Sequence, residues 1–466
     1  MPMNSPPKLA ALVLAMALAG CAVGPRYEGA PLVDTPVAFK EGQGSWVKAV
    51  PADMLERGPW WTLFGDTVLN DLASRVEVNN NTLAAAVASY NQARALTAEQ
   101  RSSLFPTVGL NSGASRSGGR GGTPERNSFS LGIGGSWEPD VFGRLSRNVA
   151  SARASEGASL ADLQSVRLAI QGELAINYFN LRQADAQRAI VNATIAGYQR
   201  TLQITNNRYQ AGIVARTDLL QAQTQLSNAQ ADLLSVERQR AQLEHAIAVL
   251  VGVAPANFAL AAMEGWMPTV PDVPVSVPST LLQRRPDIAA SERRVAQANE
   301  QVGIAISGYY PSIGLNGSLG VGAASIGDLF SASALVWSVG ASLAQTLFNA
   351  GATDARVDRA RAAMEQAAAN YRQTVLSAFQ EVEDQLVASR ILAQQLVLRQ
   401  QASASADLVE QQVLNRYTAG QIGFTEVITA QITAANARRA VLQAQVDRQT
   451  AAVALIQGLG GGWRGL

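Results

Sequence analysis

The chain contains one sequence unit twice. The hexapeptide Asn207–Gly212 (NRYQAG) returns as Asn415–Gly420 (NRYTAG), and similar residues follow both copies at a constant offset of 208, without a gap, for about forty positions. A second pair of similar segments lies upstream, at residues 105–111 and 310–316. A 466-residue chain with a repeat of about 200 residues is one structural unit written twice, rather than an ordinary two-domain enzyme.

Proline placement shows where long helices can form. All 18 prolines precede residue 312, and none occurs in 60–105, 140–254 or 312–466. Proline costs about 3 kcal/mol inside a helix, so these gaps can hold uninterrupted helices. Apolar residues recur there with coiled-coil spacing, as at Leu160, Leu163, Ile170, Leu174 and Leu181. We predict helices over about 67–102, 144–209, 217–251, 286–307, 352–417 and 425–457, the two longest extending roughly 100 Å each.

Between the helices, apolar and small or polar residues alternate with a period of two. Phe129, Leu131 and Ile133 alternate with serines and glycines, and Leu335–Leu343 repeats the pattern. This period predicts strands with one apolar face. Their partners are 104–115 and 309–321, joined through glycine-rich loops at 116–123 and 322–333. Each repeat therefore has one hairpin, at about 104–138 and 309–346, with strands of about ten residues, near the length that crosses a bilayer.

Four such strands cannot close on themselves. An open sheet edge in lipid leaves backbone groups unsatisfied at several kcal/mol each, so strands in a membrane must be completed by other copies of the chain. Oligomerisation follows from the strand count if the hairpins lie in the membrane. The alternative is a water-soluble hairpin packed on the helices.

The N-terminus has the features of a secretory signal. Lys8 provides a positive region, Leu9–Ala19 an apolar region, and Leu18–Cys21 a small-residue cleavage site. This resembles a bacterial lipoprotein signal, which implies removal of residues 1–20, lipidation of Cys21 and, with Ala22 following, passage to the outer membrane. The alternative is a chance cysteine beside an ordinary signal peptide.

Composition argues against several classes of function. The net charge of +1 argues against a nucleic-acid partner. The single cysteine cannot form an internal disulfide, and no Cys/His cluster has metal-ligand spacing. The one histidine, His245, fits an ordinary helix position. With no phosphate-binding loop and no catalytic constellation, we expect a non-enzymatic protein with no cofactor beyond a lipid on Cys21.

The chain divides into four parts on these criteria. The signal peptide covers 1–20, and a proline-containing strap covers 21–59. The first repeat covers 60–265 and the second 266–466, with a proline-rich connector at about 253–280 between their helices.

Several short motifs follow in a fixed order. They are Cys21–Tyr27, Trp60-Trp61 with Phe64 and Asp66, Trp137–Gly143 with Arg144, Leu281–Ile288, and Arg-Tyr-x-x-Gly at 208–212 and 416–420. Each motif alone is weak, but their order resembles that of the TolC-like outer membrane efflux protein family, in its lipoprotein branch of the OprM and NodT type. The resemblance spans essentially the whole mature chain.

The resemblance implies a homotrimer. Twelve strands, four per chain, would close a β-barrel in the outer membrane, continued by a coiled-coil barrel of helices across the periplasm. Such a duct passively conducts drugs or other small toxic solutes, received through a periplasmic adaptor from an inner-membrane pump, here expected to be of the RND type. The same duct in a type I protein-secretion system is the nearest alternative. A periplasmic coiled-coil scaffold lipoprotein is an alternative of another class.

The resemblance also assigns roles to the two repeated turns at the periplasmic end. It places Tyr417 opposite Asp218 with Thr217 beside it, as a gate, while Ile422 stands where relatives have a basic partner. Glu426 aligns with an acid at the narrowest point, and Thr429 replaces a second acid. Both acids also suit the first turn of any helix, where they stabilise the helix dipole. The turn residues expected to contact the adaptor are Arg208, Tyr209, Gly212, Arg416, Tyr417 and Gly420.

Overall fold

The computed structural model describes residues 23–29, 33–42, 58–119, 123–263, 265–271 and 285–461. The signal peptide, Cys21 and residues 281–284 of the fourth motif lie outside these ranges, as do parts of the strap and connector. Two compact units share the chain. The first is formed by Met1–Leu32, Ala88–Leu160 and Ala290–Gln373, and the second by Val33–Val87, Ala161–Ala289 and Thr374–Leu466.

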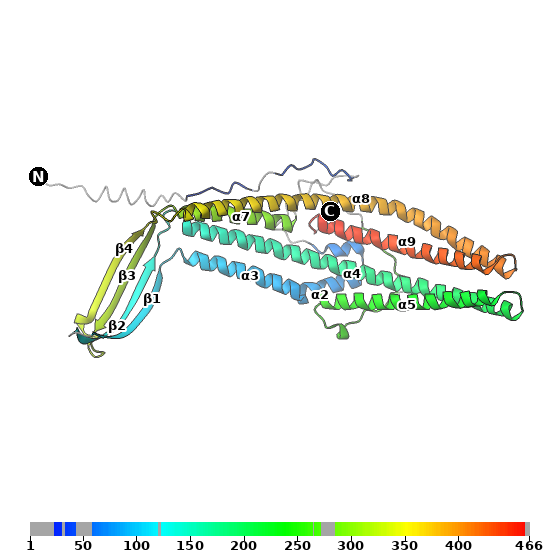
Figure 1. Cartoon of the computed structure of the whole chain (residues 1–466), viewed down its shortest axis with the longest axis horizontal. Coiled ribbons are helices and arrows are strands. Elements are labelled where there is room, and N and C mark those ends of the chain that lie inside the picture. Colours follow the sequence, from blue (N-terminus) through cyan, green and yellow to red (C-terminus); the bar gives the residue numbers. More distant parts are fainter. Residues whose placement is uncertain are drawn as a thin grey trace. The chain divides into compact units, whose positions relative to one another are not determined.

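Long helices dominate the described residues (Figure 1). The two longest, α4 and α8, have 67 residues each, and the two that follow them, α5 and α9, have 35 each, so the repeat is visible in the helix lengths. Among the described residues, no helix combines the length and apolarity needed to span a bilayer. The elements are η1 (Trp60–Phe64), α2 (Thr67–Asn79), α3 (Asn81–Ser102), α4 (Arg144–Gln210), α5 (Arg216–Leu250), η2 (Pro255–Asn257), α7 (Pro286–Ser307), η3 (Ala332–Ala334), α8 (Ala352–Thr418) and α9 (Phe424–Gly458).

The predicted helix 67–102 is in fact two helices. Asn80 adopts extended backbone angles between α2 and α3. Its side chain accepts a hydrogen bond from Leu83 N at 2.9 Å and donates one to the Leu250 carbonyl, at the end of α5, at 2.7 Å. Asparagine competes well for backbone groups in this way. A buried polar anchor therefore interrupts a stretch that helix propensity alone predicts to be continuous.

The four strands form one antiparallel sheet in the order β1 (Thr107–Gly119), β2 (Thr123–Trp137), β3 (Ser312–Ala323) and β4 (Leu335–Ala344). The prediction of a loop over 116–123 is wrong at the described residues 116–119 and 123, because β1 continues to Gly119 and β2 begins at Thr123. Arg116 and Glu125 form an ion pair across this extension. Cross-strand pairing thus stabilises a glycine-rich segment as strand.

The register gives the sheet two different faces. On one face exposed apolar side chains are paired across strands, as Leu110 with Ile133, Ile133 with Leu319, and Leu319 with Trp337. The other face presents glycine, serine and asparagine, as in the pairs Gly132–Gly320 and Asn316–Gly340. An exposed apolar face of this extent indicates contact with another apolar phase.

In the first unit, the strap segment 23–29 lies against α4 and α7. Val23 N donates to the Phe142 carbonyl, and the Tyr27 hydroxyl donates to the Glu292 carboxylate at 2.5 Å. A Cβ atom on Gly24, whose φ is +100°, would lie 2.7 Å from the Gly303 Cα. Only glycine fits this backbone conformation and this close approach.

In the second unit, the strap segment 33–42 is held by α8. The Glu383 carboxylate accepts hydrogen bonds from the backbone N–H groups of Lys40 at 2.7 Å and Glu41 at 2.9 Å. The Phe39 ring packs edge-on against Phe379, with 6.5 Å between centroids.

The second motif forms part of the core of the second unit. Trp60 is buried and its indole N–H donates to Gln171 at 3.0 Å. Asp66 caps α2 by accepting from Val68 N and Leu69 N, and it also accepts the Tyr178 hydroxyl proton at 2.6 Å. Burial and this hydrogen bond raise the pKa of Tyr178 well above its usual range. The motif is therefore structural.

Candidate functional site

The two repeated turns have the same backbone. Gly212 and Gly420 have φ values of +74° and +77°, and the next residue in each turn donates to the carbonyl five positions earlier, Ile213 N to Arg208 O and Gln421 N to Arg416 O, both at 2.9 Å. This is the helix ending that requires a left-handed residue. The glycine in each Arg-Tyr-x-x-Gly motif thus reverses the chain between a long helix and a shorter one.

The second turn is anchored in a hydrophobic cluster. Tyr417 is 1% exposed and Phe424 3%, and their ring centroids are 5.6 Å apart. They pack with Val427 of α9 and Ala222 of α5. Ile422, at the position where a basic partner was expected, also packs against this cluster. An apolar contact therefore occupies the position of the missing basic residue.

A buried polar network joins the two helix pairs beside this cluster. The hydroxyls of Tyr417 and Thr205 lie 3.1 Å apart, Thr205 Oγ1 donates to the Thr201 carbonyl at 2.9 Å, and Gln431 Nε2 donates to Thr201 Oγ1 at 2.9 Å. All four side chains are buried. Satisfied buried networks fix one arrangement of the elements that they connect.

Arg208 covers this network from the first turn. Its guanidinium carbon lies 4.6 Å from the centroid of the Tyr417 ring, and its Nη1 donates to the Tyr417 carbonyl. A cation over an aromatic face is stabilising, more so when partly desolvated. Arg208 was predicted only as an adaptor-contact residue, and it also holds the second turn against the first.

The corresponding residues of the first turn lie at the surface. Tyr209, the counterpart of Tyr417, is 38% exposed, and Arg216, the counterpart of Phe424, is exposed. Arg416, the counterpart of Arg208, is exposed as well. The structure therefore brings Tyr417 and Arg208 together and leaves Tyr209 and Arg416 apart from them.

The predicted gate residues other than Tyr417 lie in the first turns of α5 and α9. Thr217 and Glu426 are exposed and Asp218 is half-buried. In the described part of one chain, the Tyr417 hydroxyl bonds to Thr205 and makes no hydrogen bond to Asp218. The caps Ala215 and Gly423 provide no side-chain hydrogen bond, so these acids are the groups that complement the helix dipole at each start.

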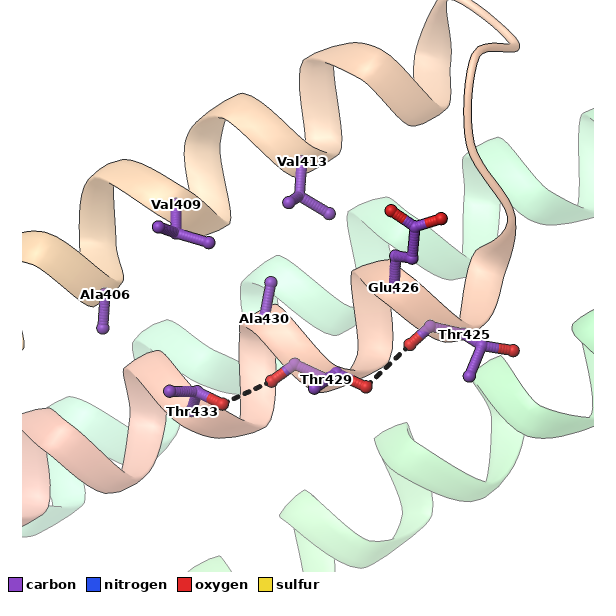
Figure 2. Close-up of a pocket in the computed structure, with 8 residues that line it drawn as sticks. All are labelled: Ala406, Val409, Val413, Thr425, Glu426, Thr429, Ala430 and Thr433. Atoms are coloured by element: carbon purple, nitrogen blue, oxygen red, sulfur yellow. Dashed lines mark hydrogen bonds between the residues drawn. The ribbon is translucent and has the colours of Figure 1, made fainter.

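A groove of about 350 Å³ lies between α8 and α9 next to the second turn (Figure 2). It is largely apolar, with Ala406, Val409 and Val413 on the α8 side. On the α9 side, Thr429 and Thr433 donate to the carbonyls four residues earlier, at 2.9 and 2.7 Å, which leaves few free polar groups. Glu426 lies at the end of the groove nearest the turn.

The described residues contain no group of three or more His, Cys, Asp or Glu side chains that could hold a metal ion. One ionised cluster links helices to the connector. Asp185, 1% exposed, accepts from Arg182 at 2.9 Å and from Arg240 at 2.7 Å, and both arginines also donate to carbonyls of residues 260–261. Their arrangement is that of a structural anchor.

Comparison with known proteins supports one family across the chain. The sequence profile described as outer membrane efflux protein matches residues 72–253 and 277–461. The cation efflux system protein CusC of Escherichia coli O6:H1 is 29% identical over 462 residues, covering 99% of this chain and all of the relative. The antibiotic efflux pump outer membrane protein ArpC of Pseudomonas putida is 29% identical over 473 residues, covering 98% of this chain and 95% of that protein.

Solved structures agree with the sequence comparison. The outer-membrane channel OprN superposes with a TM-score of 0.86 at 29% identity, covering 95% of this chain and all of OprN. The predicted fold class is confirmed: the chain is one subunit of a trimeric outer-membrane channel, with a strand domain and a helical domain that extends into the periplasm. Proteins of this kind transport solutes and are not enzymes. The chain belongs to the outer membrane efflux protein family.

Proposed function

We propose that this channel is the passive exit duct of a tripartite efflux system. An inner-membrane pump of the RND type supplies the energy, and a periplasmic adaptor connects the pump to the turns at the ends of the long helices. The observation that carries the proposal is the pair of identical helix reversals, one of which is fixed by the buried Tyr417. A duct needs an end that holds closed by itself and can be opened by a partner.

We call the contacts of Tyr417 with Thr205 and Arg208 the latch. The strength of these contacts suits a closed end that a partner can open. The Tyr417–Thr205 hydrogen bond contributes about 1 kcal/mol, and the Arg208 cation over the ring about 0.5–2 kcal/mol. Such contacts hold a closed state and yield to a binding partner. Thr217, Asp218 and Glu426 complete the proposed gate from the exposed first turns, where the neighbouring subunits of the trimer meet.

The same turns present the adaptor-contact surface. The exposed residues are Tyr209 and Gly212 in the first turn and Arg416 and Gly420 in the second. Ile213, which follows Gly212, is 62% exposed. Exposed apolar and arginine side chains at a helix reversal suit protein recognition. An adaptor that binds Arg208 or the Tyr417 backbone would loosen the latch directly, which couples docking to opening.

The cargo class is drugs or other small toxic solutes. CusC is named for cation efflux and ArpC for antibiotic efflux, and each is 29% identical to this chain. Equal similarity to ducts of different systems supports a duct that transmits what the pump selects. Lipidation of Cys21 anchors the strap in the membrane, since two or more acyl chains anchor stably.

The gate is tested by single-channel recording. Asp218→Ala combined with Tyr417→Phe, in the trimer reconstituted in planar bilayers, raises conductance because both proposed closing contacts are removed. Tyr209→Phe in the exposed turn is the matched control. Unchanged conductance in the double variant removes the gate assignment.

The efflux function is tested in the cell. Deleting the gene and profiling sensitivity to antibiotics, dyes, solvents and metals should reveal hypersensitivity that the wild-type gene reverses. Loss of a secreted protein without any change in sensitivity would favour the type I secretion alternative.

A further inference from the structure

A second groove, of about 560 Å³, lies in the first unit between α7 and α8, close to the start of β3. Three arginines line it, Arg294 from α7 and Arg356 and Arg359 from α8, together with Gln297 and Gln301. No acidic side chain lines the groove. The charged side chains that line this groove are therefore arginines, each of which can donate several hydrogen bonds.

The acids nearest along α8 point elsewhere. Asp354 and Asp358 are each two residues from Arg356, about 200° around the helix and thus on the face opposite Arg356, and Asp358 is about 100° around the helix from Arg359. Asp354 accepts a hydrogen bond from Tyr309, and Asp358 pairs with Arg361 at 3.7 Å. Arg356 and Arg359 are exposed and make no ion pair with a described residue. Their charge is available to a ligand.

The strap shows which side of the helices this groove is on. On α7, Glu292, Asn299 and Gly303 contact the strap segment 23–29. Gln301 lies two residues from both Asn299 and Gly303, and it faces the groove, donating to Ser151 of α4 at 3.1 Å. The strap and the groove thus lie on opposite faces of α7.

The strap must lie outside the duct if Cys21 is lipidated, because Val23, only two residues later, is bonded to Phe142. The opposite face of α7, with the groove, then faces the interior. This step depends on the lipid anchor under the proposed function. With three chains around one axis, the interior receives three copies of the arginine groove.

We infer that Arg356 and Arg359, repeated in the three chains, form an anion-attracting ring inside the duct, next to the strand domain. The ligands that fit are small anions and organic solutes bearing a carboxylate, sulfonate or phosphate, which arginine binds through paired N–H groups. The ring concentrates such solutes just before they enter the strand domain.

The test measures ion selectivity of the reconstituted trimer. In planar bilayers with a tenfold KCl gradient, Arg356→Gln with Arg359→Gln lowers the anion-to-cation permeability ratio by about twofold or more, since rings of charge set the selectivity of a pore. The difference shrinks from 0.1 M to 1 M salt, as the Debye length falls from about 10 Å to about 3 Å. Arg356→Lys with Arg359→Lys keeps the wild-type ratio, because it keeps the charge.

Arg361→Gln is the matched control, because it removes an arginine of the same helix from the opposite face. The inference is overturned if the double glutamine variant keeps the wild-type ratio, or if Arg361→Gln lowers the ratio equally. The second outcome would place the groove outside the duct. Failure of the proposed duct function gives another result, the absence of channels in the wild-type trimer.

Discussion

The two helix reversals of this chain share a backbone and differ in what their side chains do. Both end a 67-residue helix with a left-handed glycine and begin a 35-residue helix with an acid in its first turn. In the second copy, Tyr417 and Phe424 are buried, whereas in the first Tyr209 and Arg216 are exposed. The two copies therefore keep the same backbone reversal, but the aromatic side chains are buried only in the second copy.

The helices behind the turns explain the division. Tyr417 finds a hydroxyl partner in Thr205 of α4, next to Thr201. At the corresponding positions α8 has Val413 and Val409, which have no polar group to offer a tyrosine and instead line the apolar groove. A buried tyrosine hydroxyl needs a hydrogen-bond partner. Only the second copy can therefore bury its tyrosine without leaving the hydroxyl unsatisfied.

The largest effect should come from exchanging the buried ring of the second copy for the residue of the first. Phe424→Arg places a cation in the Tyr417 cluster and should destabilise the second turn by about 4 kcal/mol. Hydrogen exchange over residues 409–431 measures the loss. Arg216→Phe, the reverse exchange at a site that is exposed in the single chain, should change exchange over 201–223 much less. Equal responses would mean that the two turns are not differently packed.

Removing the two tyrosines comes next. Tyr417→Ala leaves a cavity in the cluster and should cost about 3 kcal/mol in local stability, with a rise in single-channel conductance. Tyr209→Ala should cost less than about 0.5 kcal/mol, as exposed substitutions do, and should weaken adaptor binding instead. Limited proteolysis at the turns measures the loss of local stability, and a pull-down with the adaptor measures the loss of binding. If the first turn of Tyr209→Ala were cleaved as fast as the second turn of Tyr417→Ala, the two turns would not differ in packing as described.

The hydroxyl pair should contribute a smaller amount. Thr205→Val removes the partner of the Tyr417 hydroxyl and should cost about 1 kcal/mol, or somewhat more if the hydroxyl is left unsatisfied. A double-mutant cycle with Tyr417→Phe, read by hydrogen exchange, isolates the coupling. A coupling near zero would show that the buried ring, and not its hydroxyl, holds the turn.

The acids should have the smallest effect on stability. Asp218→Asn and Glu426→Gln should each cost about 0.3–1 kcal/mol through loss of the helix-dipole interaction. If Glu426 surrounds the narrowest point, Glu426→Gln also lowers cation selectivity at 0.1 M salt, whereas a dipole role alone leaves selectivity unchanged. Measuring the ion selectivity of each variant under the same bilayer conditions distinguishes the two roles.

Most of the fold could be predicted from residue spacing alone. Proline-free stretches with heptad periodicity gave helix ends within one or two residues for α4, α5, α8 and α9. Two features could not be predicted. Asn80 interrupts a helix because it binds a carbonyl that is 170 residues away in the chain. Residues 116–119 belong to a strand because they pair with residues across the hairpin. Both depend on partners that local propensity does not contain.

The candidate site was predictable in position and less so in detail. The repeated glycines located both reversals, and the family resemblance pointed to Tyr417. The partners Thr205, Thr201 and Gln431 were missed, because single threonines in a long helix give no signal of their own. One signal was available in the sequence. When the repeats are aligned at the offset of 208, Thr201 and Thr205 correspond to Val409 and Val413.

The carboxylate of Glu383 has a consequence for how this chain can vary. It holds the strap through the backbone N–H groups of Lys40 and Glu41, which every residue except proline provides. The side chain of Lys40 can therefore vary during evolution while the backbone stays fixed on α8, whereas Phe39 is also held by its packing on Phe379. Mutational scanning should find residue 40 broadly permissive, with proline as the marked exception, and Glu383 itself intolerant of change.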